Sequence, residues 1–152
     1  MDAQLFCPAV FDEVAFGPRQ LGLDEAGVDG RVRDCLQLLG IEHLARRAPY
    51  HLSEGEKRSV ALASVLALNP DVLALDEPMN GLDPRSKRFL REVIASLNAA
   101  GKTILCSTHD FAYVEDLFTR AVVISRDHAV ARDDSYAAVL ADRAFLADQD
   151  IA

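Results

Sequence analysis

Two segments of the chain have hydrophobic patterns of different kinds, one helical and one extended. From Glu25 to Leu39, apolar residues recur every three or four positions, which predicts an amphipathic helix with Asp24 as its N-cap and Gly40 as its stop. Val72–Leu75 is instead an unbroken apolar run, which is typical of a strand buried on both faces of a parallel sheet that helices cover. The two patterns together indicate an α/β protein.

Caps, breakers and shorter apolar runs predict the remaining elements. Gly17-Pro18 should end the first helix, and Asp127-His128 should form the turn of an antiparallel strand pair. The order strand, helix, strand over residues 72–106 predicts a right-handed crossover between parallel strands. We expect helices at Ala9–Phe16, Ser53–Leu68, Pro84–Ala99 and Phe111–Leu117, strands at Thr103–Cys106, Ala121–Ser125 and Ala129–Arg132, and a helical tail capped at Ser135 and Asp142.

Polar residues follow both predicted parallel strands at the point where each strand ends. Asp76 and Glu77 follow the first strand, and His109 follows the second. Because ligands of open α/β sheets bind at the carboxyl edge, these three side chains should emerge together there. Adjacent residues of a strand point to opposite sides, so one carboxylate can address a metal ion and the other a water molecule. The pair is suited to hydrolysis of a magnesium nucleotide.

The composition limits the class of protein. With 152 residues, half of them apolar, the chain can form one domain with a sizeable core. The longest apolar stretch, Val60–Leu68, is too short to cross a bilayer, and the N-terminus does not resemble a signal peptide, so we expect neither membrane insertion nor export. The three cysteines lack metal-ligand spacing, which favours reduced thiols in the cytosol. A net charge of −8 argues against nucleic-acid binding.

Four motifs, in their order and spacing, resemble the ABC-type ATP-binding subunits of membrane transporters. They are Leu52–Glu56 (LSEGE), Leu75–Pro78 (LDEP), Gly81–Asp83 (GLD) and Ser107–Asp110 (STHD). Asp12–Pro18 (DEVAFGP) and Pro49–Ser53 (PYHLS) are most similar to the cobalt/nickel and energy-coupling-factor importers. The resemblance covers nearly the whole chain but only the C-terminal part of a full subunit.

The resemblance implies a fold and a domain organisation. The fold is α/β, a partial P-loop NTPase-like (ABC ATPase) fold with a mainly parallel sheet covered by helices and a helical subdomain that carries the signature loop. Residues 1–152 then form one partial ATP-binding domain. Within it, residues 8–68 or so are the helical signature subdomain, residues 70–132 or so carry the Walker B, D-loop and H-loop motifs, and residues 133–152 are a helical tail.

The phosphate-binding loop of this family, the Walker A motif G-x-x-x-x-G-K-[ST], does not occur in the sequence. Gly101-Lys102-Thr103 contains part of it, but Ser96 stands five positions before Gly101 and the triplet leads from a helix into a strand. We therefore expect that the chain alone does not grip a nucleotide as its relatives do. Either Met1 begins a truncated or split gene product, or Met1 is a misassigned start and the missing half lies upstream of it, or a separate polypeptide supplies the remainder.

The resemblance assigns a role to each residue at the strand ends. Asp76 corresponds to the carboxylate that coordinates Mg²⁺, and Glu77 corresponds to the base that orients and deprotonates the attacking water. His109 corresponds to the histidine that contacts the γ-phosphate. The structural alternatives are a strand-end aspartate that forms a turn and a histidine held by local hydrogen bonds.

The resemblance also assigns roles at two helix starts. Ser53, Gly55 and Glu56 belong to the signature loop, which binds the γ-phosphate of ATP held by the opposite subunit, and Asp83 belongs to the loop at the dimer interface. Local structure offers an alternative for each: a capping box between Ser53 and Glu56, and an N-cap at Asp83. Glu54 would repel a phosphate unless its side chain turns away.

The implied function is ATP binding and hydrolysis, with ATP and Mg²⁺ as cofactors, in an importer of cobalt, nickel or a similar small solute. The implied partners are a second ATPase subunit, arranged head to tail, and membrane-embedded transporter subunits, which places the protein in the cytoplasm at the inner face of the cell membrane. One alternative is a truncated, non-enzymatic module that contributes only a signature loop or an interface to a partner. Another is a soluble ATPase of the same superfamily that acts on DNA or ribosomes, although the chain has neither a long coiled-coil insertion nor a second cassette.

Overall fold

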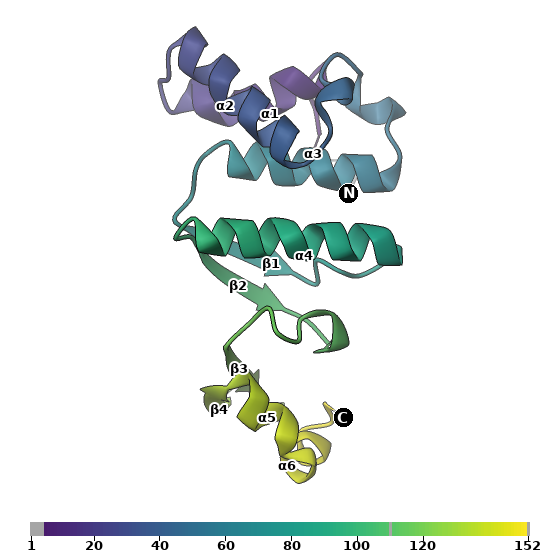
Figure 1. Ribbon diagram of the computed structural model, residues 1–152, viewed down its shortest axis with the longest axis vertical. Helices are drawn as coiled ribbons and strands as arrows, with labels where there is room; N and C mark the ends of the chain where they lie inside the picture. Colours follow the sequence, from purple (N-terminus) through teal and green to yellow (C-terminus); the bar gives the residue numbers. More distant parts are fainter. Residues whose placement is uncertain (1–4, 110, 152) are drawn as a thin grey trace. The chain divides into compact units, whose positions relative to one another are not determined.

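The computed structural model describes residues 5–109 and 111–151, with the side chain of Ala112 left aside. Figure 1 shows these elements along the chain. In order they are α1 (Val10–Gln20), α2 (Glu25–Leu38), the 3₁₀ helices η1 (Glu42–Leu44) and η2 (Pro49–His51), α3 (Glu54–Leu66), β1 (Val72–Asp76), α4 (Pro84–Ala99), β2 (Thr103–Ser107), the 3₁₀ helix η3 (Phe111–Tyr113), β3 (Arg120–Ile124), β4 (Val130–Ser135), α5 (Tyr136–Ala141) and α6 (Arg143–Asp148).

The chain divides into two compact units. The first unit extends to Leu73 and also includes Ser96–Ile104, and the second unit comprises Ala74–Ala95 and the chain from Leu105 onward. The first unit therefore contains α1, α2, α3, η1 and η2. We call these five helices the helical lobe. The second unit contains the carboxyl ends of β1 and β2, the β3–β4 pair and the C-terminal helices.

The helical lobe has a closed apolar core. Its wholly buried side chains come from all three α-helices and from η1, and they include Val10, Val14, Val28, Val32, Leu44 and Val60. The capping of these helices agrees with the sequence. Asp24 accepts a hydrogen bond from the Gly27 amide (2.9 Å), and Gly40 adopts a left-handed φ of 65° after α2.

The first helix is longer than the sequence predicted. Gly17 and Pro18 were expected to stop it, but α1 continues through both residues to Gln20. The reason is tertiary packing, because Pro18 is buried in the lobe and a Cβ on Gly17 would lie only 2.5 Å from Cδ2 of Leu68. Gly17 therefore permits a close approach and does not end the helix.

β1 and β2 form a two-stranded parallel sheet, as the crossover predicted. At their amino ends the Thr103 amide donates to the Asp71 carbonyl (2.9 Å), and at their carboxyl ends the Glu77 amide donates to the Ser107 carbonyl (3.0 Å). Both strand arrows point the same way in Figure 1. The expected burial on both faces is wrong in this structure, since Leu73 is 5% exposed but Val72 is 56% exposed. Two strands alone provide no second layer for the outer face of the sheet.

β3 and β4 pair antiparallel, as predicted, with Val122 opposite Asp133 and an irregularity between Val123 and Ile124. The expected helix at Phe111–Leu117 is wrong beyond its first turn. Only the 3₁₀ helix η3 forms there, and Asp116 adopts a left-handed φ of 63°, which does not fit an α-helix.

The C-terminal tail packs on one face of β3 and β4. Its small core contains Val123, Val139 and Leu146. Both predicted helix caps are present, because Ser135 accepts a hydrogen bond from the Ala138 amide (3.2 Å) and Asp142 accepts one from the Phe145 amide (3.0 Å).

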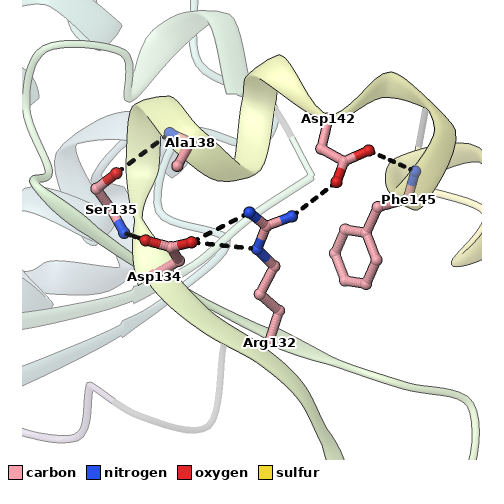
Figure 2. A network of polar contacts seen from close by, with 6 residues as sticks. All are labelled: Arg132, Asp134, Ser135, Ala138, Asp142 and Phe145. Atoms are coloured by element: carbon pink, nitrogen blue, oxygen red, sulfur yellow. Dashed lines mark hydrogen bonds and ion pairs between the residues drawn. The ribbon is translucent and has the colours of Figure 1, made fainter.

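An arginine on β4 connects these caps, as Figure 2 shows. The guanidinium of Arg132 donates to Asp142 (2.9 Å) and to Asp134 (3.1 Å), and its carbon lies 5.3 Å from the centre of the Phe145 ring. The Phe145 amide, and after it the Arg132 guanidinium, hold the pKa of the Asp142 carboxyl below its usual range. The network thus ties the start of α6 to β4.

Candidate functional site

The carboxyl ends of β1 and β2 bring together the residues that the sequence singled out there. Asp76 is the last residue of β1, and its Oδ1 accepts a hydrogen bond from the hydroxyl of Ser107, the last residue of β2. Glu77 follows directly, and its amide donates to the Ser107 carbonyl (3.0 Å). The two strand ends are therefore joined by main-chain and side-chain hydrogen bonds.

The Glu77 carboxylate is held by the two residues that follow β2. Its Oε2 accepts a hydrogen bond from the Thr108 hydroxyl (3.2 Å). Its Oε1 accepts one from the His109 amide (3.0 Å) and lies 2.7 Å from Nδ1 of the His109 ring. The imidazole is 77% exposed and the Glu77 side chain 32% exposed, so this contact is open to solvent. Asp110, the last residue of the STHD motif, lies outside the described residues.

The backbone of Glu77 is unusual. Its φ is 45°, in the left-handed region that non-glycine residues adopt at a cost of about 1–2 kcal/mol. The Asn80 amide donates to the Glu77 carbonyl (3.1 Å), and Met79 is only 1% exposed, so the turn after β1 is anchored on both sides of Pro78. The surrounding hydrogen bonds hold Glu77 in this conformation and aim its carboxylate toward Thr108 and His109.

Cys106 reports the electrostatic character of these strand ends. Burial raises the pKa of its thiol, and the negative charges of Glu77 and Asp76 raise it further, to about 11. Negative charge at the site therefore disfavours formation of a thiolate.

Ser53 and Glu56 form the capping box at the start of α3. The Ser53 amide and hydroxyl both lie 2.7 Å from Oε2 of Glu56, and the Glu56 amide donates to the Ser53 hydroxyl (3.3 Å). Hydrogen bonds from the Ser53 hydroxyl and amide lower the pKa of the Glu56 carboxyl. Glu54 pairs with Lys57 (2.9 Å), so part of its charge is offset, and Gly55 leaves open space where a Cβ would stand.

Asp83 caps α4. It accepts hydrogen bonds from the Arg85 amide (2.9 Å), the Ser86 amide (3.2 Å) and the Ser86 hydroxyl. These bonds, with the Ser86 hydroxyl as the largest cause, lower the pKa of the Asp83 carboxyl. The local alternative for Asp83, an N-cap, is therefore present. Ser53, Gly55 and Glu56 lie in the first unit, and Asp83 lies with Asp76, Glu77 and His109 in the second.

No role for Ser107 or Thr108 was predicted from the sequence, although both stand in the STHD motif. The structure shows that each holds one of the two carboxylates. Their positions relative to Asp76 and Glu77 depend on the strand register. Two further observations concern the described residues alone: no three His, Cys, Asp or Glu side chains gather as a metal cluster, and no helix is long and apolar enough to cross a membrane.

Comparison with known proteins identifies the family. A family model described as "AAA domain, putative AbiEii toxin, Type IV TA system" matches residues 12–114. A Clostridium acetobutylicum protein named "Putative ABC transporter ATP-binding protein" is 59% identical over 150 residues, which are 99% of this chain and 62% of that protein. The "Nickel import ATP-binding protein LarO" of Lactiplantibacillus plantarum is 51% identical over 132 residues, covering 87% of this chain and 55% of LarO.

A solved structure agrees with these relatives. CbiO1 from Clostridium perfringens, described as part of the ABC transporter complex CbiONQ, superimposes with a TM-score of 0.82 at 33% identity, over 97% of this chain and 59% of CbiO1. The fold is thus a partial P-loop NTPase-like α/β fold, as predicted. The chain belongs to the ATP-binding proteins of ABC transporters, and it spans about half to two thirds of the length of the relatives it matches. The resemblance found in the sequence is confirmed.

Proposed function

We propose that this chain supplies the hydrolytic residues of an ABC-type ATP-binding subunit. One observation carries the proposal: Asp76, Glu77 and His109 meet at the carboxyl ends of two adjacent parallel strands. In open α/β sheets this edge is where ligands bind. The polar side chains available there carry carboxylate and imidazole groups, which suit phosphoryl transfer to water.

Glu77 and His109 act on the water and the γ-phosphate. A general base must lie within hydrogen-bond reach of the water that it deprotonates, and the Glu77 carboxylate is partly exposed at the strand ends. The His109 ring, 2.7 Å from that carboxylate, is placed to orient the water and contact the terminal phosphate. Phosphoryl transfer depends mostly on positioning, so fixed side chains at this edge are the main requirement.

The residues at the tip of β1 fit a magnesium ion. Asp76 offers a carboxylate oxygen and Ser107 a hydroxyl beside it, and Mg²⁺ prefers oxygen ligands of this kind, commonly one or two carboxylates together with substrate phosphates. When bound, the ion would neutralise charge on the phosphate oxygens. Asp76 is the residue of this chain that would hold it, and Ser107 would orient Asp76.

The start of α3 is the second nucleotide-binding element in this proposal. Ser53, Gly55 and Glu56 form the signature loop and contact the γ-phosphate of ATP held by a second ATPase subunit, arranged head to tail. The capping box supports this role because it holds the first amides of α3 at an exposed helix start. Asp83 lies at the interface between the two subunits and also caps α4.

The helical lobe, residues 8–68 or so, is proposed as the signature subdomain that docks on membrane-embedded transporter subunits at the cytoplasmic face. Exposed aromatic side chains support docking: Phe16 of α1 is 46% exposed, Phe6 just before the lobe is 66% exposed, and their rings meet edge to face at 5.2 Å. Residues 70–132 or so form the catalytic core, and residues 133–152 form the tail. The transported solute in this proposal is cobalt, nickel or a similar small solute, and the name of LarO, a nickel import ATP-binding protein, supports it.

A second candidate function is a non-enzymatic module that contributes a signature loop to a partner. The absence of G-x-x-x-x-G-K-[ST] from the sequence favours it for the chain studied alone. The two candidates differ in whether Glu77 matters for hydrolysis.

The test is ATP hydrolysis by the chain alone and by a completed cassette. In the completed cassette, this chain is joined to the part of the Clostridium acetobutylicum relative that lies outside the matched region. We expect weak binding and negligible turnover from the chain alone, and magnesium-dependent hydrolysis from the completed cassette. Glu77→Gln should lower turnover at least about 100-fold while ATP binding is retained, because a general base contributes that much, and His109→Ala should lower it strongly.

Glu42 and His43 provide matched controls, since they are an exposed glutamate and histidine outside the strand ends. Glu42→Gln and His43→Ala should leave turnover unchanged. Normal turnover of the Glu77→Gln cassette would overturn the role of the base. Robust hydrolysis by the chain alone that is lost in Glu77→Gln would overturn the expectation that further polypeptide is needed.

A further inference from the structure

The strand register pairs each carboxylate with its own hydroxyl. Asp76 and Ser107 are the last residues of two parallel strands, and their side chains are hydrogen-bonded. Glu77 and Thr108 are the residues directly after each strand, and their side chains are also hydrogen-bonded. The pairing of the two strand ends thus continues for one residue beyond each strand.

The hydroxyl of Ser107 holds the carboxylate of Asp76. It donates to Oδ1 of Asp76, which fixes the rotation of that carboxylate and leaves Oδ2 outside this hydrogen bond. The Glu77 amide donates to the Ser107 carbonyl (3.0 Å) and, at a longer distance, to the Ser107 hydroxyl (3.4 Å), so replacing the Ser107 side chain leaves the shorter main-chain contact in place. The carboxylate that the Ser107 hydroxyl holds is therefore that of Asp76.

Thr108 acts on the other carboxylate. Its hydroxyl donates to Oε2 of Glu77 (3.2 Å), while Oε1 receives the His109 amide (3.0 Å). The two oxygens of Glu77 are thus held by consecutive residues of one segment. With both oxygens engaged, the plane of the carboxylate is fixed relative to the His109 ring.

We propose that Ser107 and Thr108 are positioning residues with separate duties: Ser107 orients Asp76 toward the metal ion, and Thr108 orients Glu77 toward the attacking water. This inference rests on the proposed function. It requires that the two duties be separable, because each hydroxyl contacts a different carboxylate. If Ser107 and Thr108 only stabilised the strand ends, replacing either side chain would disturb the carboxylates of both Asp76 and Glu77.

The first test uses the chain itself, with ¹³C-labelled Asp and Glu carboxyl groups observed by NMR. Ser107→Ala should move the carboxyl resonance of Asp76 and leave that of Glu77, and Thr108→Val should do the reverse. Ser107→Thr and Thr108→Ser, which keep the hydroxyl, should restore the native resonances. Thr119→Val, which removes an exposed hydroxyl elsewhere in the second unit, serves as the control. If both variants moved both resonances, or neither moved any, the inference would be wrong.

The second test uses the completed cassette and separates magnesium dependence from maximal rate. Ser107→Ala should raise the Mg²⁺ concentration needed for half-maximal hydrolysis about tenfold with little loss at saturation, and Thr108→Val should lower the saturated rate about tenfold with unchanged Mg²⁺ dependence, as expected for loss of one hydrogen bond to a charged group. The reverse assignment, or equal effects of both variants, would overturn the inference.

Substitution of the two carboxylates themselves distinguishes failure of the positioning inference from failure of the proposed function. If Asp76→Asn and Glu77→Gln also left hydrolysis unchanged, the proposed function would be wrong. If they abolished hydrolysis while Ser107→Ala and Thr108→Val behaved as the unaltered cassette, only the positioning inference would be wrong.

Discussion

The helical lobe buries its aliphatic side chains, whereas the strands leave many side chains of the same types exposed. In the lobe, three helices and η1 enclose Val14, Val28 and Leu44, which are wholly buried. On the strands, side chains of the same type stay about half exposed or more: Val72 (56%), Leu105 (58%), Val122 (48%), Ile124 (55%) and Val130 (62%). Helices can close a core among themselves, whereas the outer face of a two-stranded sheet needs another layer. An apolar run in a helix of this chain thus reports packing within the lobe, and one in a strand reports a covering layer that two strands do not supply.

The largest expected effect is a difference in the free energy of unfolding when the same substitution, Leu→Ala, is made in each of the two regions. Leu44→Ala, in the closed core, should lower the free energy of unfolding by about 2–5 kcal/mol, because it leaves a cavity. Leu105→Ala, at a 58% exposed position, should change it by less than about 0.5 kcal/mol. Urea unfolding followed by circular dichroism measures both values. Equal losses in the two variants would contradict the comparison.

Thiol labelling sharpens the comparison with an effect of intermediate size. Burial raises the pKa of Cys35 in α2 to about 11, and burial together with Glu77 and Asp76 raises the pKa of Cys106 in β2 to about 11. The two thiols therefore ionise alike, and their rates should differ through access alone. Cys35 is 6% exposed and Cys106 is half-buried, so Cys106 should react with a thiol reagent at least about tenfold faster at pH 8.

This measurement is made in a Cys7→Ser variant, so that Cys35 and Cys106 are the two thiols that react with the reagent. Loss of the difference in mild urea, with Cys35 becoming as reactive as Cys106, would show that opening of the lobe limits its rate. Equal rates in native buffer would mean that the lobe is not closed.

The smallest expected effect concerns two helix caps, one in each region. The pKa of Glu56 is lowered by hydrogen bonds from Ser53, and the pKa of Asp142 is lowered by the Phe145 amide and then by Arg132. Because each pKa is lower in the folded state, each cap contributes its full stability above the ordinary value, 4.5 for Glu56 and 3.8 for Asp142, and loses it as the pH falls through the folded value.

Amide NMR between pH 6 and about 2 follows this loss at the Glu56 and Phe145 amides. Glu56→Gln should remove the acid-dependent change at α3 and leave the one at α6, and Asp142→Asn should do the opposite. Loss of both changes in a single variant would show that the two regions respond to acid as one.

Local features of the fold were predictable from the sequence, and tertiary ones were not. The caps at Asp24, Ser53 and Asp142 depend on a few adjacent residues, and all three form as predicted. The stop at Gly17-Pro18 was wrong because burial of Pro18 and the nearness of Leu68 outweigh local propensity. The burial predicted for Val72 was wrong because the covering layer is a property of a larger sheet.

The candidate site shows the same division. The meeting of Asp76, Glu77 and His109 followed from one rule, that parallel strands end at a common edge. The partners of those residues did not follow, because Ser107 and Thr108 acquire them through the register of β1 against β2, which the sequence does not reveal. The left-handed backbone of Glu77 was equally invisible, since glutamate has no preference for it.

The register also determines where this chain tolerates insertions. One extra residue inside β2 would rotate Ser107 and Thr108 to the opposite sides of the strand, and each carboxylate would face the wrong neighbour. The turn at Gly101, whose φ is 89°, lies before the strand and could lengthen without altering the pairing that follows. Length variation is therefore compatible with the connection and incompatible with the strand, although only five residues separate Gly101 from Ser107.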